Sequence, residues 1–188
     1  MSTSIQNNTE HWLELLNAEL RGTSDRSCVI TAASIIDHLL LEFLRARLVP
    51  NSSATDSLFD GANAPIGTFS ARIDLAHRIG LISSQFARDL HLIRRMRNDL
   101  AHSIVARTFS DPGVSDQVLH LVRSLKLRER CSFMLTAPYD GTRGAFLICV
   151  IVIVSGLDAQ VRTIQALKTQ VDDPVYTTSF SETTKSGA

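Results

Sequence analysis

The sequence contains few cysteines and few aromatic residues, and it has no excess charge of either sign. Of its 188 residues, Cys28, Cys131 and Cys149 form no C-x-x-C pair, so neither a disulfide framework nor a zinc site is predicted. The 19 Lys and Arg residues balance 19 Asp and Glu residues, so net charge gives no reason to expect a nucleic-acid or membrane partner. No Gly-rich phosphate loop, metal-ligand spacing or DNA-reading helix-turn-helix is found. We therefore expect no cofactor, no metal and no direct DNA binding.

Long apolar segments are also scarce. The N-terminal residues MSTSIQNNTEHW lack a basic region followed by an apolar stretch, so they do not resemble a signal peptide. The longest apolar run, residues 145–157, has 13 residues, whereas a membrane span needs about 20. These features predict a cytoplasmic protein without membrane association, in which this run forms a deeply buried helix.

Apolar residues make up 44% of the chain, enough for a substantial core, and most recur with helical spacing. The pattern predicts an all-α, single-domain bundle of about six or seven helices over residues 1–170. A polar tail, expected to be disordered, would follow over residues 171–188. The β-branched run at 149–154 would also suit a strand, but the helical spacing after it favours a helix. The expected helices cover residues 10–21, 25–49, 56–60, 68–79, 83–106, 114–127 and 143–170.

Charge is distributed unevenly along the balanced chain. Residues 1–60 carry eight acids and four bases, whereas residues 88–130 carry nine bases and five acids. The basic segment would suit RNA, DNA or an acidic protein as a partner. Alternatively, these charges belong to ordinary solvated helix faces.

The hexapeptide RNDLAH, residues 97–102, combines groups that bind phosphate and transfer protons. On a helix, Asn98 and His102 are neighbours, but Arg97 lies about 140° round the axis from His102. A straight helix therefore does not direct Arg97 and His102 to one point. Three arrangements would bring them together: a helix that distorts or ends near His102, a curled arginine, or two copies meeting in a dimer.

Two interpretations of the hexapeptide remain open. In the structural one, Arg97 pairs with a buried acid such as Asp37 or Asp74, and His102 is an exposed residue at a helix end. In the enzymatic one, RNA is cleaved without a metal. His102 would then act as general acid or base, Arg97 would stabilise the phosphorane, and Asn98 would orient either group.

RNDLAH matches the R-[NDH]-x-x-x-H pattern of HEPN domains, which are helical, usually dimeric, and in many cases RNases. A longer stretch, about residues 10–160, resembles the mannitol operon repressor (MltR) family. GTFSARIDLAHRIGLI (67–82) and RRMRNDLAH (94–102) carry most of this resemblance, supported by SDRSCVITAASIIDHLLLEFLRARL (24–48). The Ser/Thr-rich tail and residues 131–145 depart from the family pattern.

The resemblance implies an HEPN-like helical fold and a bacterial, cytoplasmic transcriptional repressor, of a mannitol or other sugar-alcohol operon. It implies a homodimer or higher homo-oligomer acting through a protein partner, since no DNA-reading element is present. The alternative is a metal-independent HEPN endoribonuclease, a toxin or RNA-processing enzyme, with RNA as substrate and Arg97, Asn98 and His102 as catalytic residues.

Further residues occupy polar positions of the family, and we interpret them as interhelical ion pairs around a binding cleft. Arg72 and Asp74 flank Ile73, so both cannot face inward on a regular helix, and one of them is expected to meet the RNDLAH helix. The residues assigned to binding by this resemblance are Asp25, Arg26, Asp37, Arg72, Asp74 and Arg94.

Overall fold

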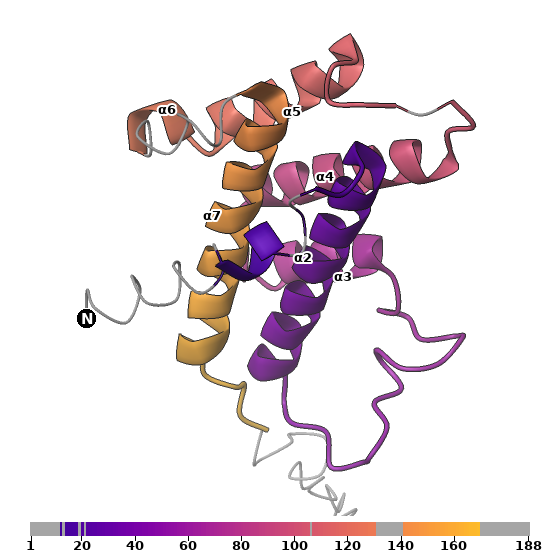
Figure 1. Cartoon of the computed structure of the whole chain (residues 1–188). Coiled ribbons are helices and arrows are strands. Elements are labelled where there is room, and N and C mark those ends of the chain that lie inside the picture. Colours follow the sequence, from indigo (N-terminus) through magenta and orange to yellow (C-terminus); the bar gives the residue numbers. More distant parts are fainter. Residues whose placement is uncertain are drawn as a thin grey trace, which may run out of the picture.

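The computed structural model describes residues 12, 14–18, 20, 22–105, 107–130 and 141–169 (Figure 1). Within these residues the regular structure is entirely helical, which confirms the predicted all-α single-domain bundle. The helices with defined bounds are α2 (Asp25–Arg47), α3 (Phe69–Arg78), α4 (Ser84–His102), α5 (Pro112–Ser124), α6 (Leu127–Arg130) and α7 (Gly141–Thr163).

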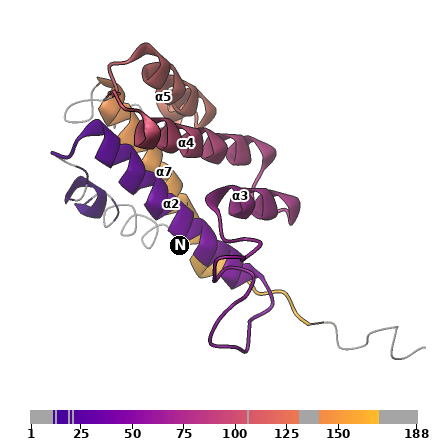
Figure 2. The ribbon, with the colours of Figure 1, turned by 90° about the vertical axis from the view of Figure 1, so that its right-hand side faces the viewer.

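The centre of the bundle is the pair formed by α2 and α7, which run side by side (Figures 1 and 2). Both helices have 23 residues, of which nine in α2 and ten in α7 are buried. In α7 the run from Cys149 to Val154 is helical, so the expected helix is confirmed. Packing of these apolar surfaces against each other forms the centre of the hydrophobic core.

By length and composition alone, α2 and α7 would each suffice to cross a membrane, although half of each apolar segment is buried inside the bundle. The 13-residue apolar run is only part of α7, so the length of that run alone did not decide whether the complete helix could cross a membrane. Core helices of globular proteins have similar length and composition, and α2 and α7 pack against each other as core helices do.

The remaining helices cover the central pair. Figure 2 shows α3 and α4 on the same side of α2, with α5 beyond α4, and α5 also packs on α7. The side chains of Ser24, Thr68 and Ser83 accept hydrogen bonds from backbone N–H groups in the first turns of α2, α3 and α4. Gly80, just beyond α3, has φ +73°, the left-handed conformation that glycine adopts at little cost.

One predicted helix is absent and several predicted helix bounds were wrong. The helix expected over residues 114–127 is α5 (Pro112–Ser124), followed by the unpredicted α6 (Leu127–Arg130). Residues 56–60 form a turn, in which the N–H groups of Phe59 and Asp60 donate to the carbonyl of Asp56. Helix α4 ends at His102 instead of residue 106, and α7 ends at Thr163 instead of residue 170. The predicted tail, residues 171–188, lies outside the described residues. The predicted N-terminal helix is described only in part, with residues 14–18 helical.

Candidate functional site

Helix α4 carries the RNDLAH hexapeptide and has one buried and one solvent-facing side. Leu90, Ile93, Met96 and Leu100 are at most 1% exposed and anchor the helix in the core. This apolar side was predicted from the 3.6-residue spacing. Ile104 was expected to continue it, but it is fully exposed because α4 ends at His102. The polar side of α4 lines three hollows on the surface.

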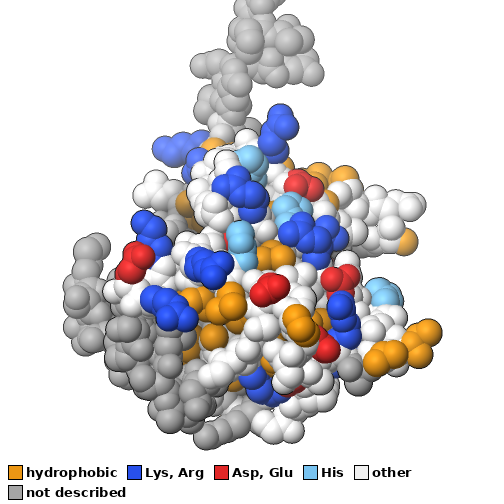
Figure 3. All heavy atoms as spheres, turned by 90° about the horizontal axis from the view of Figure 1, so that it is seen from above, with side chains coloured by type: hydrophobic (Ala, Val, Ile, Leu, Met, Phe, Trp, Pro, Cys, Tyr) orange, Lys and Arg blue, Asp and Glu red, His pale blue; other side chains and the backbone are white. Residues whose placement is uncertain are grey.

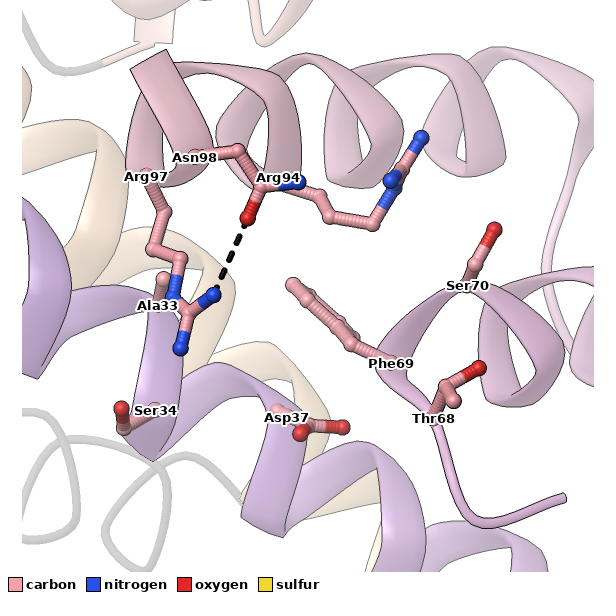
Figure 4. Close-up of a pocket in the computed structure, with 9 residues that line it drawn as sticks. All are labelled: Ala33, Ser34, Asp37, Thr68, Phe69, Ser70, Arg94, Arg97 and Asn98. Carbon is pink, nitrogen blue, oxygen red and sulfur yellow. Dashed lines mark hydrogen bonds between the residues drawn. The ribbon is translucent and has the colours of Figure 1, made fainter. Parts of the chain in front are cut away.

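A hollow of about 250 Å³ lies between α4, α2 and the beginning of α3 (Figure 4). We call it the arginine pocket. It is lined by Ala33, Ser34 and Asp37 of α2, by Thr68, Phe69 and Ser70 at the start of α3, and by Arg94, Arg97 and Asn98 of α4. Figure 4 shows Arg97 reaching toward α2, whereas the Arg94 side chain extends along α4 with its guanidinium group on the far side of the Phe69 ring from Arg97.

Arg97 does not pair with either predicted acid. Its Nη1 donates to Oδ1 of its neighbour Asn98 at 3.0 Å, and the side chain is exposed. Asp37 instead accepts from Arg72 Nη1 at 2.8 Å, with the two side chains 26% and 12% exposed. The predicted pairing of Arg97 was wrong because α3 and α4 both pack against α2 near Asp37. Arg72 of α3, rather than Arg97 of α4, forms the ion pair with Asp37.

Arg72 and Asp74 do point to different neighbours, as their spacing predicted. Arg72 also donates from Nε to the carbonyl of Ile66 and from Nη2 to that of Gly67, both at 3.2 Å, which fixes the loop before α3 against α2. Asp74 Oδ1 lies 3.1 Å from His91 Nε2 on α4. Asp74 is therefore the residue of the two that meets the helix carrying RNDLAH, although its partner lies outside the hexapeptide.

His102 is exposed at the last position of α4 and lines a different, shallow hollow. Asn98 borders this hollow as well as the arginine pocket, whereas Arg97 borders the arginine pocket only. The helix does end at His102, which was one of the three proposed ways to unite Arg97 and His102. Within one chain, however, this ending leaves the two side chains in separate hollows.

Asp25 and Arg26 are in the first turn of α2, and Arg26 lies beside the C-terminal end of α4. Both side chains link helices to each other or to the loops between them. Arg26 Nε donates to the carbonyl of Leu100, and its Nη2 donates to those of Ala101 and Ser103. Asp25 pairs with Arg143 of α7 and accepts from the backbone N–H of Phe109 at 2.9 Å. Arg143, which also donates to the carbonyls of Leu20 and Thr23, was missed because no periodic or motif signal marks it.

A second, larger hollow of about 650 Å³ runs between α4 and α5. We call it the basic groove; it is lined by Arg88, His91, Leu92, Arg94, Arg95, Asp116, Gln117 and His120. On the face shown in Figure 3, basic and histidine side chains gather close together. The sequence indicated a basic segment over residues 88–130, but the contribution of His120 depends on the packing of α5 against α4.

The described residues include no cluster of three or more His, Cys, Asp or Glu side chains arranged to hold a metal ion. Asp89 is a buried carboxylate, 2% exposed, but it lies between α4 and α5 rather than in a hollow. It accepts hydrogen bonds from Ser124 Oγ at 2.5 Å and Gln85 Nε2 at 3.3 Å. These contacts satisfy the carboxylate and make Asp89 a structural link.

Comparison with known proteins gives one consistent likeness, although no protein-family model matches the chain. The mannitol operon repressor of Escherichia coli K12 is 31% identical over 119 residues, covering 60% of this chain and 59% of the repressor. The repressor of E. coli O6:H1 (strain CFT073) gives the same values. The match therefore spans less than two thirds of the length of these repressors.

Among solved structures, a chain of the "MtlR-HPr complex from Escherichia coli" superimposes with a TM-score of 0.55. The alignment covers 82% of this chain and 98% of that chain, at 20% sequence identity, and it shows a shared fold. This chain is thus similar to the mannitol operon repressor of E. coli in sequence over 119 residues, and it has the fold of a chain in the MtlR–HPr complex.

Proposed function

We propose that this chain is a bacterial transcriptional regulator of the mannitol operon repressor type, located in the cytoplasm. The observation that carries the proposal is the sequence match to the E. coli repressors, which agrees with a fold likeness covering 82% of this chain. The regulated operon would be one for mannitol or another sugar alcohol.

We further propose that regulation runs through a protein partner. The similar solved structure is a complex with HPr, and HPr from the same bacterium is the first partner to test. The chain itself offers suitable surfaces, because the basic groove is open and Ile104 and Val105 beyond α4 are 101% and 76% exposed. Exposed apolar side chains beside charged ones are typical of protein-binding surfaces. Self-association into a homodimer or higher homo-oligomer is part of the same proposal.

The alternative of an endoribonuclease that uses Arg97, Asn98 and His102 is not favoured by this geometry. A general acid or base must lie within hydrogen-bond reach of the group it serves, and Arg97 and His102 border separate hollows. A composite site would need a second copy of the chain. RNA cleavage in the presence of a chelator by the wild type, and its loss in His102→Ala, would reverse this preference.

The proposed regulation is tested by deleting the gene in its host and measuring all transcripts during growth with and without mannitol. We expect the transcripts of a sugar-alcohol operon to rise in the deletion strain and to return to normal when the gene is restored. Transcript levels that do not change in any operon would contradict the proposal. A gel shift on the promoter of that operon, at several salt concentrations, then separates direct DNA binding from action through a partner.

The partner is tested by calorimetric titration of the full chain with HPr. We expect saturable binding, and we expect the double variant Ile104→Ser/Val105→Ser to bind less tightly if the exposed apolar pair contributes. Leu58→Ser is a matched control, because Leu58 is 45% exposed in the loop between α2 and α3. Equal loss in both variants would show that the apolar pair has no specific role, and no binding by the wild type would exclude HPr.

A further inference from the structure

The arginine pocket holds two positive charges that no carboxylate neutralises. In the part of the chain that the structure describes, Arg94 and Arg97 belong to the many arginines that pair with no acid, and both of them line this one hollow. Among the described residues, Arg94 Nε is shielded from solvent without a hydrogen-bond partner, and the Arg97 guanidinium donates a hydrogen bond to the Asn98 amide. Two unpaired guanidinium groups that border one hollow create a strongly positive local potential.

Asp37, the one acid among the described residues that line the arginine pocket, does not cancel this potential. Its carboxylate is already paired with Arg72 at 2.8 Å, and Arg72 itself is held by the carbonyls of Ile66 and Gly67. The Asp37–Arg72 pair is neutral as a unit. The charge of the pocket is therefore set by Arg94 and Arg97, and an anion would sit on the α4 side, away from Asp37.

The first turn of α3 adds hydrogen-bond donors to the same pocket. Thr68 Oγ1 caps this helix by accepting from the N–H of Ala71 at 3.2 Å. The backbone N–H groups of Phe69 and Ser70 have no hydrogen-bond acceptor among the described residues, and both residues line the pocket. Free N–H groups at a helix N-terminus bind anions, particularly when positive side chains are nearby.

We propose that the arginine pocket binds a small phosphate-bearing anion, either inorganic phosphate or a phosphate monoester. Its oxygens would accept from the guanidinium groups of Arg94 and Arg97 and from the first N–H groups of α3. The hydroxyl groups of Ser34 and Ser70 and the Asn98 amide would contact the remainder of an ester. The volume of about 250 Å³ restricts the ligand to a small molecule.

Phosphate fits this donor set better than a carboxylate does. A tetrahedral phosphate presents oxygens in several directions, so it can accept from two arginines and a helix terminus at once. A single carboxylate has two oxygens in one plane and would satisfy one guanidinium fork. The pocket also lies entirely within one chain, so this binding requires no second copy and no contact with His102.

The experiment is a calorimetric titration of the full chain with inorganic phosphate and, separately, with glycerol 3-phosphate as a probe ester. We expect saturable binding that weakens as sodium chloride is raised, because the attraction is electrostatic. Arg97→Gln should weaken binding about tenfold, since it removes charge-assisted hydrogen bonds. Arg97 is exposed and makes no ion pair with the described residues, so this variant should fold normally.

Arg95→Gln is the matched control, because Arg95 is an exposed arginine of the same helix that lines the basic groove instead. It should bind phosphate like the wild type. Tighter binding of the ester than of inorganic phosphate would identify the organic part as a ligand component, and equal affinity would identify phosphate itself. No binding of either probe, or equal losses in Arg97→Gln and Arg95→Gln, would overturn the proposal. Phosphate binding does not depend on the regulatory role, so either can fail without the other.

Discussion

Cys28 and Cys149 illustrate how burial in the α2–α7 pair controls the chemistry of single side chains. Both thiols are 0% exposed, as predicted from their apolar surroundings. Burial raises the pKa of Cys28 from 9.0 to about 11, an effect that the Arg143 guanidinium partly offsets. Burial also raises the pKa of Cys149 to about 12, with a further contribution from the Asp89 carboxylate. Both thiols therefore stay protonated and unreactive near neutral pH.

The raised pKa values predict a loss of stability in alkali. Above pH 9 the unfolded chain releases these thiol protons, whereas the folded chain keeps them until about pH 11 for Cys28. The stabilisation is complete below pH 9 and is lost as pH rises toward the folded pKa, at up to about 1.4 kcal/mol per pH unit for each thiol. In Cys28→Ala, the free energy of unfolding should fall less steeply between pH 9 and 11, measured by urea denaturation. Parallel curves for variant and wild type would contradict this expectation.

Thiol reactivity gives an independent measurement of the same burial. In a Cys131→Ser background, which removes the cysteine outside the described residues, we expect no reaction with a disulfide reagent at pH 8 in the native state. Two thiols should react at once in denaturant. Fast labelling of the native protein would show that α2 and α7 separate readily.

At the scale of elements, Arg26 determines how α4 ends. The last carbonyls of a helix lack partners inside it, and Arg26 satisfies those of Leu100, Ala101 and Ser103 from the first turn of α2. These hydrogen bonds satisfy the carbonyls at the point where α4 ends, at His102 instead of the predicted residue 106. Arg26 and Leu100 are 74 residues apart in the sequence, so no local sequence pattern could reveal this contact.

Replacement of this arginine should loosen the end of α4. Arg26→Lys keeps the charge but not the fork of donors, so we expect the free energy of unfolding to fall by about 1–3 kcal/mol. Amide hydrogen exchange should also accelerate at residues 100–103. Arg45→Lys on the same helix is the control. Its ion pairs with Glu42 and Asp60 are exposed and contribute at most about 1 kcal/mol. Equal effects of the two variants would show that Arg26 does not cap α4.

For the whole molecule, the spacing of apolar residues predicted the helices, whereas the angles at which the helices pack against one another determined the site. The predicted starts of α2, α3 and α4 agree with the structure to within one residue, where Ser24, Thr68 and Ser83 cap the helices through local hydrogen bonds. The partner of Asp37 was predicted incorrectly, because α3 and α4 both approach α2 and only their packing decides which arginine arrives. The arginine pocket has the same origin, since three separate helices supply its walls.

The predicted end of the helical domain, at residue 170, can be tested by truncation of the chain. After α7 ends at Thr163, the chain returns over the end of α2, where the Leu167 N–H donates to the Arg47 carbonyl at 2.8 Å. Arg47 Nη1 donates in turn to the Gln165 carbonyl at 2.9 Å. A chain truncated after Gln170 keeps both hydrogen bonds, so its thermal midpoint should match that of the full chain. Truncation after Thr163 removes both.

These two hydrogen bonds should contribute about 1 kcal/mol each, less when exposed, so the shorter truncation should unfold about 2–6 °C lower. Differential scanning calorimetry of the three chains measures these midpoints directly. If truncation after Gln170 also lowers the midpoint, residues 171–188 contribute to the folded bundle and the predicted boundary is wrong. If neither truncation has an effect, the contacts beyond α7 do not stabilise the protein, and the folded unit ends with the α2–α7 pair.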